Sequence, residues 1–140
     1  MWGTAFAHLL ADRRHEVTLV DCDAEVVRSL AASGRNPRYL PELELEGVKA
    51  LTVSQAGELF EHVDLLVVAV PSRAFAAAVA GLPGVSPLLS LTKGLDPVSG
   101  ARLSTLVEGR PAAVLSGPNF AERSLPICPL RRSWRATIRN

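Results

Sequence analysis

The fold is decided by the first 21 residues of the chain, MWGTAFAHLLADRRHEVTLVD (Met1–Asp21). Their apolar side chains first recur at helical spacing, which predicts an amphipathic helix. These are Trp2, Ala5, Phe6, Leu9 and Leu10. Residues 17–20 then form a short run rich in β-branched side chains, which predicts a strand ending at the carboxylate of Asp21. The order is therefore helix, strand, acid.

The spacing of Gly3 and Asp21 is typical of a dinucleotide-binding βαβ unit. There the last glycine of a Gly-rich turn lets helix and strand pack closely, and an acid roughly 20 residues later accepts hydrogen bonds from the ribose hydroxyls. If Gly3 is that glycine, the first strand and the rest of the turn would precede Met1. A glycine near a helix start and an acid after a strand also occur in domains that bind no cofactor, so the pair alone does not decide.

The rest of the sequence alternates between strand and helix patterns. Strands are predicted over 48–53, 65–70, 87–92 and 112–115. Helices are predicted over 24–32 with Asp23 as N-cap and Gly34 at the end, over 54–60 and 72–80 with Ser54 and Ser72 as caps, and over 98–107. The run 65–70 (LLVVAV) is apolar on both faces, as in a parallel sheet covered by helices. We therefore expect an α/β fold, a doubly wound parallel sheet (Rossmann-like) lacking the first strand and its Gly-rich turn.

Ligands of such sheets bind in the loops that follow the carboxyl ends of the strands. Four loops qualify, namely Asp21-Cys22, Pro71-Ser72, Thr92-Lys93-Gly94 and residues 116–121. Lys93 is the most specific candidate, because a cation at a strand end can hold the phosphate or carboxylate of a substrate. A solvated surface lysine is the alternative.

Composition limits the classes of function. With 140 residues and 48% apolar residues, the chain suits one soluble domain, and its longest apolar run is too short to span a bilayer. The N-terminus also lacks the features of a secretory signal, so we expect a cytoplasmic protein without a membrane partner. Cys22 and Cys128 are far apart and the three histidines are scattered, so we expect no metal site and no histidine base.

Charge is distributed unevenly along the chain. From Arg123 onward there are five arginines and no acidic residue, whereas the preceding residues carry all 14 acids. A nucleic-acid site would rest on this segment alone, so no nucleic-acid partner is expected.

Six spaced motifs, taken together and in order, resemble the N-terminal domain of the bacterial NAD(P)-dependent glycerol-3-phosphate dehydrogenase family. They are WGTA (2–5), HEV (15–17), NPRYLP (36–41), VPS (70–72), TKGL (92–95) and LSGPNFAE (115–122). The resemblance covers residues 1–125 as a partial dinucleotide-binding domain. Residues 126–140 do not match and form a basic tail, for which disorder is left open.

The resemblance implies a function and a set of site residues. The family interconverts glycerol 3-phosphate and dihydroxyacetone phosphate by hydride transfer with a nicotinamide cofactor, which feeds phospholipid synthesis. The implied cofactor contacts are Trp2, Gly3, Asp21, Cys22, Pro71, Phe75, Lys93 and Ala121, and the implied substrate contacts are Lys93, Gly117 and Asn119. The family's catalytic lysine belongs to a second, helical domain, so no catalytic residue is expected on this chain, and alone it should turn over negligibly.

Asp21 and Cys22 bear on the choice of cofactor. Family members that hold the 2′-phosphate of NADP often carry His or Arg at the position of Cys22. An acid at Asp21 repels that phosphate and accepts from ribose hydroxyls, so NAD is expected, with NADP less favoured.

Two alternatives stay open. The chain could be a non-catalytic binding module that self-associates into a homodimer, because an incomplete sheet leaves unpaired backbone groups. It could also belong to another NAD-dependent hydroxy-acid dehydrogenase, against which the TKG and SGP motifs argue.

Overall fold

The computed structural model describes residues 2–117 and 135–139, which divide between two compact units. The N-terminal unit comprises residues 2–57, and the C-terminal unit comprises residues 58–117 and 135–139. Within these ranges, no helix combines the length and the apolar character that a membrane crossing requires.

The N-terminal unit is a two-stranded parallel sheet with helices. Its elements are α1 (Trp2–Asp12), β1 (Thr18–Asp21), α2 (Ala24–Ser33), β2 (Lys49–Thr52) and α3 (Val53–Ala56). Strand β1 pairs with β2 from Thr18↔Lys49 to Asp21↔Thr52. The predicted helix, strand and acid of the opening stretch are therefore confirmed.

Helix α2 begins and ends where its capping residues predict. The Asp23 side chain accepts a hydrogen bond from the Glu25 amide at 2.9 Å, and Gly34 ends the helix in the left-handed conformation at φ 67°. One face of α2 supplies the core of the unit, where Val26 and Leu30 pack with Leu45. Partly buried residues of the two strands and of the loop between α2 and β2 pack against this cluster, namely Leu19, Leu43, Val48 and Ala50.

The predicted cap at Ser54 is wrong. Thr52 caps α3 instead, because its hydroxyl accepts from the Gln55 amide while its own amide donates to the Gln55 side chain, forming a capping box. The α-helix ends at Ala56, and residues 57–61 continue as the 3₁₀ helix η1 (Gly57–Glu61).

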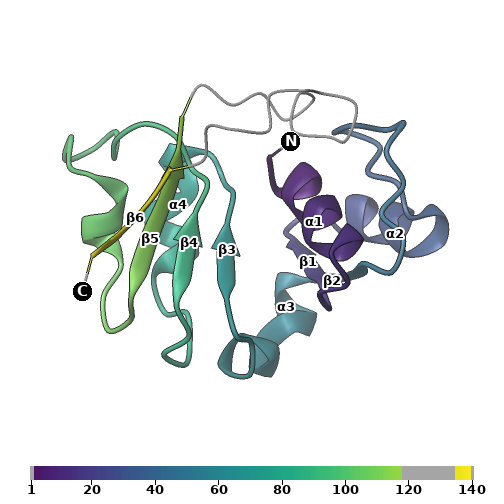
Figure 1. Cartoon of the computed structure of the whole chain (residues 1–140), viewed down its shortest axis with the longest axis horizontal. Coiled ribbons are helices and arrows are strands. Elements are labelled where there is room, and N and C mark those ends of the chain that lie inside the picture. Colours follow the sequence, from purple (N-terminus) through teal and green to yellow (C-terminus); the bar gives the residue numbers. More distant parts are fainter. Residues whose placement is uncertain (1, 118–134, 140) are drawn as a thin grey trace. The chain divides into compact units, whose positions relative to one another are not determined.

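The C-terminal unit is built on a four-stranded sheet. Its elements are β3 (Leu66–Val68), α4 (Ser72–Val79), β4 (Leu88–Ser90), the 3₁₀ helix η2 (Leu103–Leu106), β5 (Ala112–Ser116) and β6 (Arg135–Arg139). The sheet order is β3-β4-β5-β6, as Figure 1 shows, with β3, β4 and β5 parallel and β6 antiparallel to β5. The predicted α/β class with parallel strands is confirmed. Strand β6 was not predicted, and it falls within the tail for which disorder was left open.

Apolar residues of the strands and of α4 form the core of this unit. Leu66 and Leu88 are register partners and both are buried, while Phe75 of α4 has no exposed surface. Ser72 does not cap α4, because Pro71 occupies the N-cap position and no side chain bonds to the first turn. That prediction is wrong by one residue.

The helix predicted over residues 98–107 is also wrong. The Asp96 carboxylate accepts hydrogen bonds from both the hydroxyl and the amide of Ser99, at 2.6 and 2.8 Å, and these bonds fix a turn. Leu95 and Arg102 bridge across this turn, so only η2 remains helical. The bond from the Ser99 side chain, and next the one from its backbone, lower the pKa of Asp96 below its usual value.

Arg110 holds the loop between α4 and β4. Its Nη2 atom donates to the carbonyls of Leu82, Pro83 and Gly84 at 2.7–2.8 Å, and Nη1 donates to the Ser86 carbonyl at 3.3 Å. One guanidinium therefore satisfies four main-chain acceptors of the loop.

Candidate functional site

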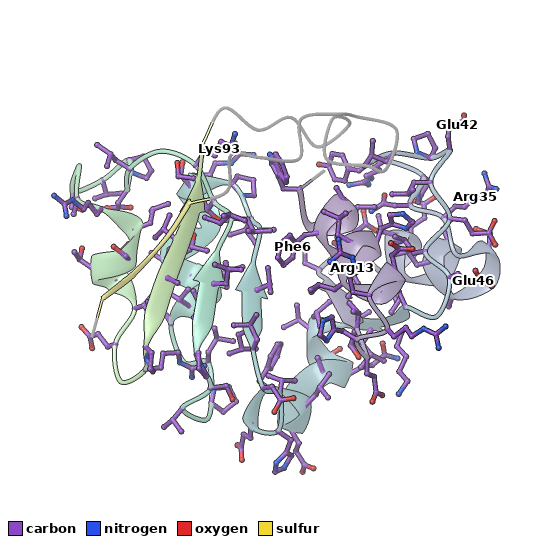
Figure 2. The ribbon with its side chains drawn as sticks, viewed as in Figure 1. Phe6, Arg13, Arg35, Glu42, Glu46 and Lys93 are labelled. Carbon is purple, nitrogen blue, oxygen red and sulfur yellow. The ribbon has the colours of Figure 1, made fainter. Side chains whose placement is uncertain are left out.

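Two of the predicted loops meet beyond the carboxyl ends of β4 and β5. The Lys93 ammonium, which follows β4, donates a hydrogen bond to the Gly117 carbonyl at 3.2 Å, and Gly117 directly follows β5. Figure 2 shows Lys93 at this end of the sheet. The structure thus brings together the cation and one of the glycines that the sequence singled out.

Thr92 joins the same edge to the end of β3. Its side chain is buried, with 7% of the residue exposed, and its hydroxyl donates to the Val70 carbonyl at 2.9 Å. The Leu91 amide donates to the Val68 carbonyl at 2.8 Å, so the pairing of the β3 and β4 segments continues past the end of β4. The Pro71 loop and the Lys93 loop are therefore fixed to one another. Sequence reasoning gave Thr92 no such role.

The backbone after Lys93 depends on glycine. Gly94 has φ 92°, a conformation that residues with a Cβ rarely adopt, and apart from its chain neighbours no described residue has an atom within 4 Å of where a Cβ would stand. The same loop borders a cavity of about 260 Å³, whose lining includes Ser90, Thr92, Gly94 and Arg102. The Lys93 ammonium is hydrogen-bonded to Gly117, and the adjacent Gly94 borders the cavity. This arrangement suits a phosphate-bearing ligand.

The strand end of the N-terminal unit has the opposite charge. At the end of β1, Asp21 Oδ1 accepts from the Asp23 amide at 2.9 Å, and Cys22 between them is exposed. Asp23 Oδ2 forms an ion pair with Arg38 Nη2 at 2.5 Å. Arg38 was not among the predicted site residues, although it lies in the quoted NPRYLP motif.

A buried amide anchors the loop that carries Arg38. Asn36 is 1% exposed and donates through Nδ2 to the Thr4 hydroxyl of α1 at 3.1 Å. Its Oδ1 accepts from the amides of Arg38 and Tyr39 at 3.0 and 3.1 Å. The motif is therefore attached to α1 by one side-chain hydrogen bond, and Asn36 also orders the motif's own backbone.

The remaining predicted site residues divide into three groups. Trp2 and Gly3 lie in the first turn of α1 and are partly buried. Phe75 is fully buried, which fits a packing role and offers a ligand no surface. Asn119 and Ala121 lie outside the described residues. Asp21 and Cys22 belong to a different unit from Pro71, Lys93 and Gly117.

A protein-family model matches most of the chain. The model is described as the NAD-dependent glycerol-3-phosphate dehydrogenase N-terminus, and the match covers residues 1–124.

Individual relatives carry the same name. The chain is 38% identical over 135 residues to glycerol-3-phosphate dehydrogenase (NAD(P)+) of Nocardia farcinica, a match that covers 86% of this chain and 40% of the relative. It is 40% identical over 131 residues to the protein of that name from Frankia casuarinae, covering 86% of this chain and 38% of the relative. The chain thus spans about 40% of the length of such relatives.

A solved structure is similar over the same extent. The crystal structure of glycerol-3-phosphate dehydrogenase from Coxiella burnetii superposes with a TM-score of 0.78 at 32% identity. The superposition covers 88% of this chain and 40% of that one.

Proposed function

Since the chain belongs to the family of NAD-dependent glycerol-3-phosphate dehydrogenase N-terminal domains, we propose that it is the cofactor-binding part of such an enzyme. The reaction is the interconversion of glycerol 3-phosphate and dihydroxyacetone phosphate, a step toward phospholipid precursors, and it takes place in the cytoplasm. A bound nicotinamide would supply or accept the hydride. The family match and the relatives' printed names support this proposal.

The single observation that carries the substrate side is the Lys93–Gly117 bond. It holds an ammonium group beyond the carboxyl ends of β4 and β5, where α/β sheets bind ligands. In the proposal, Lys93 contacts the substrate and the cofactor, while Gly117 and Asn119 line the substrate position and Ala121 contacts the cofactor through its backbone.

On the cofactor side, the chemistry of Asp21 fits a ribose. One carboxylate oxygen accepts from the Asp23 amide, and the other has no hydrogen-bond partner within residues 2–117, so it can accept from a ribose hydroxyl. We assign the pyrophosphate to Trp2 and Gly3 at the start of α1, where amide groups and the helix dipole favour an anion. Cys22 and Pro71 complete the proposed cofactor contacts, whereas Phe75, which has no exposed surface, can act only through packing. Asp21 favours NAD over NADP.

In this proposal the chain binds the nucleotide but does not catalyse the reaction by itself. The chain has no assigned catalytic acid or base, and proton transfer by a positioned group contributes typically 10²–10⁴-fold to rate. We therefore expect nucleotide binding with negligible oxidation of NADH by dihydroxyacetone phosphate. A homodimer remains a prediction, which light scattering tests.

The test compares two lysines. Lys93→Met should lower the affinity of the chain for glycerol 3-phosphate about tenfold, because a charge-assisted bond to phosphate is lost. Lys49→Met is the matched control, since Lys49 pairs with Glu16 at 2.5 Å on the surface of the N-terminal unit, and binding should stay at the wild-type level. Calorimetric titration of both variants gives the comparison. Equal affinities of Lys93→Met and the wild type would contradict the proposal.

A further inference from the structure

Three charged side chains meet at the carboxyl end of β1. Asp21 Oδ1 accepts from the Asp23 amide, Asp23 Oδ1 accepts from the Glu25 amide, and Asp23 Oδ2 pairs with Arg38. Asp23 is thus held by helix α2 through one oxygen and by Arg38 through the other. The Arg38 guanidinium therefore pairs with a residue that lies two positions after Asp21, the acid to which we assign the ribose.

The backbone of Arg38 is fixed, whereas its side chain is accessible. The buried Asn36 accepts from the Arg38 amide at 3.0 Å and is itself bonded to Thr4. The Arg38 side chain is 59% exposed, and within the described ranges Asp23 is its only side-chain partner. A guanidinium has five N–H donors in a planar fork that matches phosphate oxygens, so most of these donors are available to a ligand.

We propose that Arg38 determines cofactor selectivity by binding the 2′-phosphate of NADP(H), in place of the residue at Cys22. The inference rests on the proposed function, because it assumes a ribose at Asp21. A 2′-phosphate brings a charge of about −1.5 to −2 near pH 7, which Asp21 and Asp23 repel. Arg38 turns from Asp23 toward this phosphate and offsets the repulsion. The discrimination against NADPH is therefore weaker than Asp21 alone would impose.

The first arm of the test isolates the 2′-phosphate. Adenosine 2′,5′-bisphosphate and AMP differ only in that group, so the ratio of their dissociation constants reports on its surroundings. Both are titrated into the 140-residue chain by calorimetry, with NADPH and NADH as a second pair. Arg38→Gln should weaken binding of the 2′-phosphorylated member about tenfold and that of its partner less than about twofold.

Two further variants make the result specific. Arg35→Gln removes the same charge from the same segment, but Arg35 (Figure 2) is bonded to Glu44 at 3.2 Å and to the Pro41 carbonyl at 3.5 Å. It should leave the ratio unchanged. Asp23→Asn keeps an N-cap oxygen for α2 and removes the charge that competes for Arg38, so it should strengthen binding of the 2′-phosphorylated ligand severalfold.

The outcomes separate this inference from the proposed function. An equal loss for both ligands in Arg38→Gln, or the same change in Arg35→Gln, overturns the role of Arg38 and leaves dinucleotide binding intact. Failure of the wild-type chain to bind any of the four nucleotides overturns both. Opposite shifts of the ratio in Arg38→Gln and Asp23→Asn support the inference, because a folding defect does not strengthen binding.

Discussion

The two units hold their strand ends with opposite kinds of hydrogen bond. At the end of β1, the carboxylates of Asp21 and Asp23 accept from main-chain amides. Beyond β4, Thr92 and Lys93 donate to main-chain carbonyls. The first arrangement leaves acceptors that suit hydroxyl groups, and the second presents a cation that suits an anion. The polar groups that order each loop therefore also set the charge and the hydrogen-bonding groups that a ligand would meet there.

The greatest loss of stability should come from removing the Arg110 guanidinium, which donates to four carbonyls of the C-terminal unit. Arg110→Met leaves the carbonyls of Leu82, Pro83, Gly84 and Ser86 without their guanidinium and should lower the free energy of unfolding by about 3 kcal/mol. Urea denaturation measures the change. Arg73→Met is the control, because Arg73 is exposed on α4 and should shift stability by less than about 0.5 kcal/mol. Equal stability of the two variants would show that the loop does not depend on the guanidinium.

The N-terminal unit has its own buried anchor in Asn36. Asn36→Ala deprives the Thr4 hydroxyl and the amides of Arg38 and Tyr39 of their partner, and should cost about 2 kcal/mol. Thr4→Val removes only one of these bonds and should cost about 1 kcal/mol. Urea denaturation gives both values, and hydrogen exchange should speed up at the two amides in Asn36→Ala alone. Unchanged exchange there would mean that other contacts hold the loop.

The Thr92 hydroxyl allows a smaller change at the strand ends of the C-terminal unit. Thr92→Val keeps the shape of the side chain but leaves the Val70 carbonyl without its donor, which should cost about 1 kcal/mol. Thr92→Ser keeps the hydroxyl and should restore most of the loss. Thermal unfolding compares the three proteins. If Val and Ser variants melt together, the hydroxyl bond does not stabilise this edge.

The smallest effect depends on pH. The pKa of Asp96 is lowered in the folded protein, so its ionised form stabilises the fold above the unfolded pKa of about 4. This contribution is lost as the pH falls from about 4 through the lower folded pKa. Asp96→Asn should flatten the acid side of the stability curve, and Ser99→Ala should flatten it in part, as followed by urea denaturation at successive pH values. Parallel curves for all three proteins would contradict the role of the Asp96–Ser99 bonds.

Local signals in the sequence predicted part of this structure. The acid at Asp23 and the glycine at Gly34 bound α2 correctly, because capping involves residues within a few positions of one another. The helix predicted over residues 98–107 was wrong because another local hydrogen bond competes with the helix. The spacing of these residues favours a helix, but the Asp96 carboxylate accepts two hydrogen bonds from Ser99, and these bonds fix a turn instead.

The site was only partly accessible to sequence reasoning. Lys93 was predicted as a site residue because it follows a buried strand, and the rule for parallel sheets predicted that its loop lies near the loop that contains Gly117, where the two residues are hydrogen-bonded. The contacts of Arg38 with Asp23 and of Thr92 with Val70 were not predicted, because these partners are distant in sequence and only the folded chain brings them together. Side chains that act through such contacts carry no periodic signal.

The carbonyls around Arg110 also have a chemical consequence. The nitrogen atoms of a guanidine add to the carbonyl carbons of dicarbonyl reagents such as phenylglyoxal, and at Arg110 both terminal nitrogens donate to backbone carbonyls. Arg110 should therefore acquire adducts slowly in the native protein and rapidly after denaturation, while exposed arginines such as Arg73 react in both. Mass spectrometry of labelled peptides would then show, from the extent of labelling at this one side chain, whether its hydrogen bonds to the loop are intact.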